Sequence, residues 1–334
     1  MKKTVWYRKS GKEGDVVIST RIRLARNLLR FPFPDFASSE QKETILDMVS
    51  KSLASSDLKS VNLGKLEKRE LLSMVECHRI SPEFVEYTEN RGLFTNEDET
   101  VSIMVNEEDH IRIQVMRSGL DLKDAYKEAD KLDDLLESQL EYAFDKRLGY
   151  LPQCPTNLGT AMRASLMMHL PALQETGKIH LLSGTVSKLG LVIRGLYGEG
   201  SRAEGAVYQL SNQVTLGISE KEAIENLEGI ASQIIREERN ARKELCQNPV
   251  YEDRVWRSMG VLKTARLLSH EECSNLLSNL RIGVALGLLP DISMDTLCGL
   301  MCDIQPATIM TLCGKDLEAN ERDVKRAELV RERL

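Results

Sequence analysis

The sequence predicts a mixed domain of the α/β or α+β class, built largely from antiparallel hairpins, followed by a small domain made only of helices. Two observations support this division. Strand-like and helix-like patterns are intermixed up to about residue 250, whereas only helical patterns occur from about residue 256 onward. The length of 334 residues also suits about two domains of ordinary size.

Alternation of apolar and polar residues predicts the strands. The segments 101–105 (VSIMV) and 111–115 (IRIQV) stand on either side of the polar run NEEDH, which indicates two strands joined by a short turn. Similar alternation, interrupted by glycine and serine, predicts three more strands at residues 179–186, 188–196 and 206–213.

Apolar residues at spacings of three and four predict two long helices. The first covers residues 122–147, where leucine and alanine form one apolar face. The second starts at Ser219, which can form a capping box with Glu222, and continues to about Cys246. In the C-terminal domain, helical patterns occupy residues 268–289, 293–304 and 321–334.

Composition limits the function classes. The net charge of −6 argues against a general nucleic-acid binder. The N-terminus lacks the apolar stretch of a signal peptide, and no apolar run is long enough to span a membrane. The seven cysteines include no CxxC pair, which favours reduced thiols in the cytoplasm over disulfides or a zinc site, and we expect Cys298 and Cys302 to be simply buried.

Arginine-containing motifs are the main functional signal. The sequence has no P-loop, no dinucleotide-binding glycine fingerprint and no HRD or DFG element, so a nucleotide would have to be held in another way. Guanidinium groups stay charged and bind phosphate oxygens through paired hydrogen bonds, although each arginine taken alone also suits a solvated or salt-bridged surface position. Four segments place arginines near strand ends or glycines: STRIRLARN (19–27), EEDHIRIQ (107–114), CPTNLGTAMRAS (154–165) and RGLYGEGSRAEG (194–205).

Together these segments resemble the guanidino phosphotransferase, or phosphagen kinase, family, in the family's order and approximate spacing over residues 15–245. The resemblance implies an α+β catalytic domain at residues 1–255, with a large antiparallel sheet flanked by helices, and a helical C-terminal domain at residues 256–334. It also implies ATP and Mg²⁺ as cofactors, with Mg²⁺ held mainly through the ATP phosphates and water. The residues that match the family's contacts to ATP phosphates are Arg21, Arg23, Arg112, Arg163 and Arg194.

Two glutamates, Glu108 and Glu199, match the pair that holds the substrate guanidinium in arginine kinases of this family. The chemistry fits that role, because a guanidinium becomes nucleophilic only when a proton leaves, and a carboxylate can both align it and accept the proton. Cys154 matches the family's active-site cysteine, which implies that it orients the guanidinium. A solvated acidic turn and a buried inert cysteine are the alternatives.

The other residues of the NEEDH run have less specific expectations. We expect His110 to be structural. The roles of Glu107 and Asp109 stay open, and a contact to Mg²⁺ through water is one alternative.

The sequence departs from the family pattern in three places. Thr95 stands where the family has a histidine against the adenine, and Ala161 replaces a glycine two residues before Arg163. The paired-arginine segment begins at residue 19, so we do not expect the preceding helical domain that covers small substrates in other members. An uncovered guanidinium pocket is compatible with an arginine that is still part of a polypeptide.

These departures and the helical tail resemble the bacterial protein arginine kinases of the McsB type. The tail segment ERDVKRA matches their RDxxRA motif, which implies an allosteric phosphoarginine site lined by Arg322, Asp323 and Arg326; a charged helix face with Asp–Arg pairs is the alternative. The resemblance implies phosphorylation of exposed arginines in proteins, which marks them for Clp-type proteolysis and regulates stress responses. The implied partners are an activating adaptor, a heat-shock repressor, a Clp ATPase and a second copy of the chain, but neither a membrane nor nucleic acid.

Two rival functions stay open at the level of sequence. One is a kinase for free arginine, against which the missing front domain argues. The other is a non-catalytic phosphoarginine-binding adaptor, against which the presence of Glu108, Glu199 and the five arginines argues.

Overall fold

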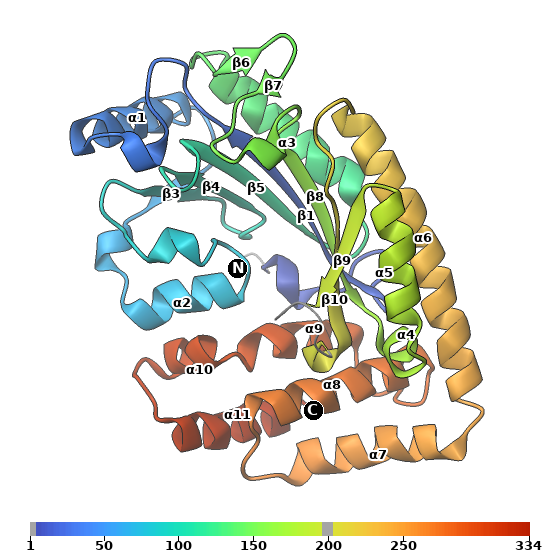
Figure 1. Ribbon diagram of the computed structural model, residues 1–334. Coiled ribbons are helices and arrows are strands. Elements are labelled where there is room, and N and C mark those ends of the chain that lie inside the picture. The colour runs from blue at the N-terminus through green and yellow to red at the C-terminus, as the bar shows by residue number, and fades with distance from the viewer. Residues whose placement is uncertain (1–4, 196–202) are drawn as a thin grey trace.

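The computed structural model describes residues 5–195 and 203–334, and its central element is an antiparallel sheet (Figure 1). Within these residues the sheet has eight strands in the order β2-β3-β4-β5-β1-β8-β10-β9, and every neighbouring pair is antiparallel. The strands span Val17–Arg26 (β1), Lys59–Val61 (β2), Gly92–Thr95 (β3), Val101–Val105 (β4), Ile111–Ser118 (β5), Met162–His169 (β8), Leu191–Gly195 (β9) and Val207–Asn212 (β10). A separate small hairpin pairs Phe144–Asp145 (β6) with Gly149–Tyr150 (β7).

Helices cover one face of this sheet (Figure 1). Helix α3 (Leu122–Glu137) packs on β1 and β5, and α6 (Glu220–Leu245) packs on β8 and β10. Helices α1 (Ser39–Ser52) and α5 (Lys178–Lys188) contact β4 and β9. Apolar residues of these helices and of the covered sheet face form the main hydrophobic core. A large antiparallel sheet flanked by helices is therefore confirmed as the architecture.

The expected hairpin around NEEDH is present. Strands β4 and β5 pair with Val105 opposite Ile111, so the turn lies between them. The strands expected at residues 188–196 and 206–213 correspond to β9 and β10. Helix α6 starts with the expected capping box, in which the Ser219 hydroxyl accepts a hydrogen bond from the Glu222 backbone N–H.

The prediction of a strand at residues 179–186 was wrong, because this segment belongs to helix α5. Ile179, Leu182 and Val186 recur at helical spacing and pack against the main core. The local alternation that suggested a strand leaves Leu181 on the outside, with 75% of its surface exposed. Burial against the core therefore decided the conformation here.

The helix expected over residues 122–147 was too long. Leu140 and Ala143 are buried, as the pattern required, but they lie beyond the end of α3 at Glu137. The backbone N–H of Ala143 donates to the carbonyl oxygen of Asn27 at 2.7 Å, just after strand β1 ends. This pairing with a distant segment replaces the helical hydrogen bonds, and local sequence carries no signal for it.

The opposite face of the sheet is partly covered by a small second core. Helix α2 (Lys68–Glu76) and the segment after it pack on β3 and β4, where Phe84, Leu93 and Met104 are buried. Met104 lies directly opposite Arg112 in the ladder. Paired residues of a ladder point to the same face, so this small core forms a wall beside the arginine side chains.

The rest of the described chain, from residue 249 onward, contains helices and no strands, as expected. The helices are α7 (Pro249–Thr264), α8 (His270–Ala285), α9 (Met294–Asp303), α10 (Pro306–Cys313) and α11 (Ala319–Arg333). They enclose their own hydrophobic cluster and lie against one end of the sheet (Figure 1). The boundary proposed between residues 255 and 256 lies within α7 and stays a prediction.

Helix α10 docks on α2 through a helix cap. The Glu76 carboxylate accepts hydrogen bonds from the backbone N–H groups of Ala307 and Thr308 at 2.8 and 2.7 Å. These N–H groups belong to the first turn of α10 and have no partner inside that helix. The contact joins the C-terminal helices to the wall beside the arginine face.

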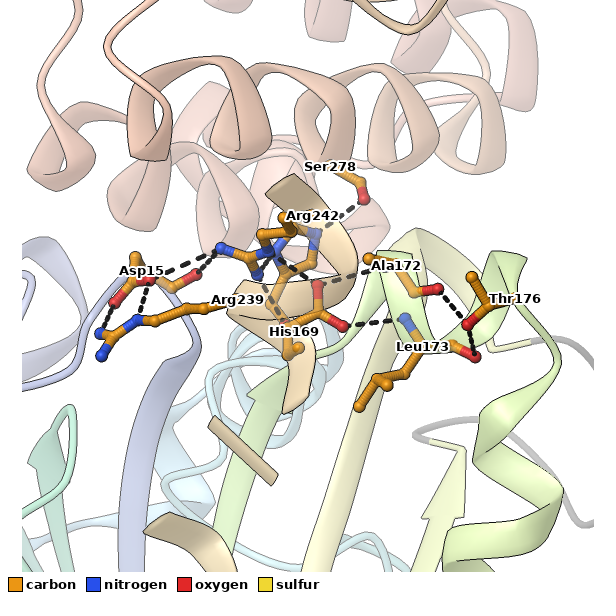
Figure 2. A network of polar contacts seen from close by, with 9 residues as sticks. Asp15, His169, Ala172, Leu173, Thr176, Arg239, Arg242 and Ser278 are labelled. Carbon is orange, nitrogen blue, oxygen red and sulfur yellow. Dashed lines mark hydrogen bonds and ion pairs between the residues drawn. The ribbon is translucent and has the colours of Figure 1, made fainter. Parts of the chain in front are cut away.

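A buried polar network joins the end of strand β8 to helices α4 (Pro171–Glu175), α6 and α8 (Figure 2). Glu238 on α6 accepts from Arg242 Nε at 2.7 Å and from two backbone N–H groups at the start of α4. Arg242 also donates to the carbonyl oxygen of His169 at 3.0 Å. The ring of His169 is hydrogen-bonded to the hydroxyl of Ser278 on α8 at 2.7 Å. The charges of Glu238 and Arg242 are thus paired inside the protein.

Two further features of the fold concern possible membrane-spanning helices and the cysteines. Among the described residues, no single helix has the length and apolar composition to cross a membrane, and only the bent pair α9 and α10 meets that test when taken together. All seven cysteines are free thiols. Cys298 is buried as expected, whereas Cys302 is only partly buried.

The network predicts a dependence of stability on pH. Burial, together with the charges of Arg281 and Arg242, holds the pKa of His169 well below its usual range, so the ring is neutral in the folded protein at pH 7. A histidine in the unfolded chain has a pKa of about 6.5. The contribution of His169 to stability is therefore complete above that pH and is lost as the pH falls below it, because only the unfolded state then binds a proton.

We expect the free energy of unfolding in urea to decrease between pH 7 and pH 5, and to decrease less in the variant His169→Gln. The glutamine keeps a polar group near Ser278 but cannot be protonated. An equal loss of stability in both proteins would contradict this assignment.

Candidate active site

The register of the sheet places the five predicted arginines on one face. Arg23 on β1 lies opposite Arg163 on β8, and Arg112 on β5 lies opposite Ala25 of β1. Arg21 follows the same alternation on β1, and Arg194 on β9 is in register with Gln209 of β10 on the same side. Since residues paired across an antiparallel ladder share a face, all five side chains project from the side that α3 and α6 leave uncovered.

Three of these arginines surround a cavity of about 90 Å³ beside the NEEDH turn. Its lining residues are Arg23, Leu24, Ala25, Glu108, Asp109, Arg112, Asn157, Ala161, Met162 and Arg163. The structure therefore brings Glu108 together with Arg23, Arg112 and Arg163. Arg21 lies further along β1, where its guanidinium donates to Ser165 Oγ and Gln209 Oε1 at 3.3 and 2.9 Å.

The NEEDH turn is held in a defined shape. Asn106 has a φ of +59°, a left-handed conformation that asparagine tolerates better than most residues. Its backbone N–H donates to the His110 carbonyl oxygen at 2.9 Å, which closes the turn. Its side-chain nitrogen donates to the carbonyl oxygens of Lys42 and Asn90. These bonds fix the direction in which Glu108 leaves the turn.

His110 stabilises the turn from inside the protein. Its ring is completely buried. The Nδ1 atom accepts from the backbone N–H of Leu28 at 3.0 Å, and Nε2 lies 2.8 Å from the carbonyl oxygen of Pro32. A carbonyl can only accept, so the proton is on Nε2 and the ring is neutral. Burial lowers its pKa in the same sense. These contacts agree with the structural role expected for His110.

Arg112 is paired with both glutamates of the turn. Its Nη1 donates to Glu107 at 2.7 Å and its Nη2 donates to Glu108 at 3.0 Å. Glu107 is buried and also accepts a hydrogen bond from the Ser81 hydroxyl at 2.6 Å, so its carboxylate is already bound by groups of the protein itself. The Glu108 side chain remains 39% exposed and faces the cavity. Glu108 is thus the glutamate of this pair that a ligand can reach.

Arg23 and Arg163 carry charge that the described residues around them balance only in part. Within the described residues, the Nε atom of each is buried and has no hydrogen-bond partner. Burial and the neighbouring arginines hold the pKa of Arg23 well below its usual range and lower that of Arg21 to about 10. Burial, followed by the charge of Arg194, lowers the pKa of Arg163. A polyphosphate anion would relieve this repulsion and bind the free N–H groups.

Glu108 has the electrostatics of a proton acceptor. Burial raises its pKa, the nearby Asp109 carboxylate adds to that effect, and Arg112 opposes it. A carboxylate with a raised pKa holds a transferred proton more firmly than an ordinary surface glutamate. This property suits a group that takes a proton from a guanidinium during reaction.

Two residues that the sequence interpretation missed connect the NEEDH turn to the Cys154 segment. Asn27, at the end of STRIRLARN, donates from Nδ2 to Asp109 Oδ1 at 2.6 Å and accepts from the His110 backbone N–H at 2.9 Å. The same Asp109 oxygen accepts from the backbone N–H of Gln153 at 2.7 Å. The only sequence signal was the position of Asn27 next to the arginine motif. Through these bonds, the turn and the Cys154 segment keep a fixed spacing.

Cys154 lies beside the cavity rather than in its lining. It is partly exposed and precedes a one-turn helix, Pro155–Asn157, whose last residue lines the cavity. Its sulfur is 3.0 Å from Thr156 Oγ1. The sulfur is also close enough to Arg163 that a negative charge on it would oppose the lowering of the pKa of that guanidinium. Glu199, the other predicted catalytic residue of this group, lies outside the described residues.

The predicted phosphoarginine residues lie together on α11. Arg326 is buried, and its guanidinium donates to the carbonyl oxygens of Ile304 and Leu268 and to Asp323 Oδ1. Arg322 donates to the carbonyl oxygen of Leu317 at 2.8 Å and remains partly exposed. Arg326 therefore has a clear structural role, while Arg322 and Asp323 are the more accessible members of the group.

The two single-residue departures from the family pattern, Thr95 and Ala161, have structural counterparts. Thr95 is buried at the end of β3, where its hydroxyl donates to the carbonyl oxygen of Val101 at 2.8 Å. Ala161 lines the cavity with a φ of +46°, in the left-handed region where glycine is favoured. The alanine at this position is therefore strained.

The carboxylates beside the cavity fit an associated Mg²⁺ ion. Asp109 Oδ2 is buried, has no hydrogen-bond partner among the described residues, and belongs to a residue that lines the cavity. Carboxylate oxygen is the ligand type that Mg²⁺ prefers, usually together with water and substrate phosphates. No group of three or more metal-ligating side chains occurs in the described chain.

Comparisons with known proteins define the class. Residues 40–241 match the family described as ATP:guanido phosphotransferase, C-terminal catalytic domain, a range that includes Glu108 but begins after Arg21 and Arg23. The structure of a lombricine kinase is similar, with a TM-score of 0.61 and 28% identity over 71% of this chain and 69% of that chain. A duplicated taurocyamine kinase from Schistosoma mansoni, with bound transition state analog components, has a TM-score of 0.61 and 26% identity over 71% of this chain and 36% of that chain. The fold is thus that of an ATP:guanido phosphotransferase.

Full-length relatives give the particular family. Residues 248–334 match the family described as Protein-arginine kinase McsB C-terminal domain. A protein-arginine kinase of Halothermothrix orenii is 47% identical over 335 residues, which cover 98% of this chain and 96% of that protein. One from Caldanaerobacter subterraneus subsp. tengcongensis is 47% identical over 328 residues, covering 96% of this chain and 97% of that protein. The chain belongs to the McsB-type protein-arginine kinase family.

The strained residue of the site gives a stability prediction. A left-handed conformation costs a non-glycine residue about 1–2 kcal/mol, and glycine avoids most of that cost while it loses more backbone entropy on folding. We expect Ala161→Gly to raise the free energy of unfolding by about 0.5–1 kcal/mol, measured by urea denaturation. Ala164→Gly on β8, the strand that begins just after Ala161, serves as the control and should be destabilising, because Ala164 is buried in the core. Destabilisation by Ala161→Gly would contradict the observed backbone conformation.

Proposed function

We propose that this chain transfers the γ-phosphoryl group of Mg·ATP to the guanidinium group of arginine side chains in proteins. The observation that carries the proposal is the single cavity in which Glu108 meets Arg23, Arg112 and Arg163. A proton acceptor and a group of phosphate-binding cations are the two components that phosphorylation of a guanidinium requires. Membership of the protein-arginine kinase family supports the choice of reaction.

In this proposal the arginines hold the nucleotide. Arg23 and Arg163, whose Nε–H groups have no partner among the described residues, bind phosphate oxygens. Arg21, Arg112 and Arg194 add positive charge from the same sheet face. Phosphoryl transfer depends mainly on positioning and on stabilising the charge of the transferred group, which such a cluster supplies. Asp109 is the residue placed to contact Mg²⁺, directly or through water.

The carboxylates act on the acceptor. Glu108 aligns the substrate guanidinium and takes its proton while the nitrogen forms a bond to the γ-phosphorus and the bond from that phosphorus to the ADP oxygen breaks. Glu199 is proposed as the second carboxylate on the guanidinium. Cys154 is proposed to orient the same group from the side of the cavity near Arg163. None of these roles requires a covalent enzyme intermediate.

The substrate is proposed to be arginine within a polypeptide. The relatives with 47% identity over nearly the whole chain are protein-arginine kinases. We further propose that phosphorylated proteins are directed to Clp-type proteolysis, that the enzyme regulates stress responses in the cytoplasm, and that an activating adaptor, a heat-shock repressor and a Clp ATPase are its partners. A homodimer through the helical tail is proposed on the same family basis.

A phosphoarginine site on α11 is also proposed. Arg322 and Asp323 are partly exposed, so they can contact a phosphate and a guanidinium, respectively. Arg326 would support the site by holding Asp323 in place at 2.5 Å. This part of the proposal rests on the RDxxRA match and on the clustering of the three residues.

The proposed proton acceptor can be tested by substitution. Glu108→Gln keeps the size and a hydrogen-bonding group but cannot accept the proton, so we expect kcat to fall by about 10²- to 10⁴-fold. The assay incubates the full chain with Mg·ATP and an arginine-rich protein, and measures phosphoarginine by mass spectrometry without acid, because the N–P bond is labile in acid. Free arginine as the acceptor is measured in parallel.

Glu89→Gln, which changes an exposed glutamate outside the cavity, is the matched control and should keep normal activity. Normal phosphorylation by Glu108→Gln would remove Glu108 from the mechanism. Phosphorylation of free arginine as efficient as that of protein would contradict the proposed substrate.

A further inference from the structure

A second cavity, of about 550 Å³, lies between α4, α7 and α8 and shares no lining residue with the cavity at Glu108. Glu175 on α4, Tyr251 and Arg254 on α7, and Glu271 on α8 contribute to its lining. It also borders Gly195 and Ala203, the described residues on either side of the segment that contains Glu199. The cavity is therefore close in the chain to the proposed catalytic machinery but separate from it.

The described lining of this cavity carries a net negative charge. Arg254 donates to both carboxylate oxygens of Glu175, at 2.8 and 3.1 Å, so these two charges neutralise each other. Glu204, another lining residue, lies 2.8 Å from Nδ1 of His270. Burial lowers the pKa of His270, which leaves its ring neutral at pH 7. The carboxylates of Glu204 and Glu271 are thus not balanced by a formal positive charge in the described lining.

The cavity also contains an unused buried polar group. Tyr251 is only 4% exposed, and within the described chain its hydroxyl has no hydrogen-bond partner. Burial raises the pKa of this hydroxyl, so it stays protonated. Buried hydroxyl groups are normally satisfied by a partner, and a missing partner points to a ligand or to water. Asn275, on the α8 side, adds a carboxamide to the same lining.

We infer that this cavity binds an organic cation, namely the ammonium or guanidinium group of a second basic residue in the protein substrate. Two carboxylates that no formal positive charge of the described lining balances favour a cation over an anion. The tyrosine hydroxyl and the carboxamide oxygen can accept its N–H groups. The volume is ample for a long basic side chain. The inference rests on the proposed action on protein-bound arginine, and it adds a specificity site that selects basic segments.

The experiment uses peptides that each contain one arginine as phosphate acceptor and, in a series, one lysine at increasing separation from it. Lysine has no guanidinium, so it can occupy the second cavity without becoming an acceptor of this reaction. At the matching separation, we expect the lysine to lower KM by about tenfold, the effect of one charge-assisted hydrogen bond, with little change in kcat. The lysine-free peptide is the reference.

The variants Tyr251→Phe and Glu271→Gln should abolish this lysine effect and leave the lysine-free peptide unaffected. Glu272→Gln is the matched control, because it removes the same charge from the next residue of α8, which does not line the cavity. The inference is overturned if lysine has no effect at any separation, or if its effect persists in both cavity variants. Failure of the wild-type protein to phosphorylate any peptide would instead contradict the proposed kinase function, and the inference with it.

Discussion

The structure depends on a group of arginine charges that the described part of the protein balances only in part. Antiparallel pairing of β1 with β5 and β8 places Arg21, Arg23, Arg112 and Arg163 on one sheet face, and the backbone ladder prevents the side chains from moving far apart. The Nε atoms of Arg23 and Arg163 are buried without partners in the described chain. Such an arrangement is unfavourable until an anion arrives, so the folded state is prepared for a polyphosphate at a cost in stability.

Other arginines of the same chain have a structural role instead, because their charges are paired with carboxylates. Arg26 directly follows the site arginines on β1, but it is buried and donates to Asp133 of α3 through three bonds of 2.6 to 3.1 Å. Arg242 is likewise buried and paired with Glu238. The contrast between paired and unpaired guanidinium groups, rather than burial alone, distinguishes structural arginines from those available to a ligand.

The sequence predicted the parts of the fold that depend on local pattern. The NEEDH hairpin, the capped α6 and the helical tail follow from periodicity and capping residues, and the arginine motifs located the cavity. It could not predict that α3 ends at Glu137 or that Asn27 and Gln153 both bind Asp109, because those contacts join segments far apart in the chain. Residues 179–186 were misassigned because a short alternating run does not show which side will be buried. The expected role of Glu199 stays a prediction.

The central claim is tested most directly by thermal unfolding with and without Mg·ATP, in the wild type, Arg23→Met and Arg26→Met. The account predicts that Arg23→Met is at least as stable as the wild type without nucleotide, since a poorly balanced charge is removed, but loses most of the stabilisation by ATP. Arg26→Met should be destabilised by about 3–5 kcal/mol, because it leaves Asp133 buried and unpaired, yet keep the stabilisation by ATP. An Arg23→Met protein that is less stable without nucleotide and still fully stabilised by ATP would contradict the account.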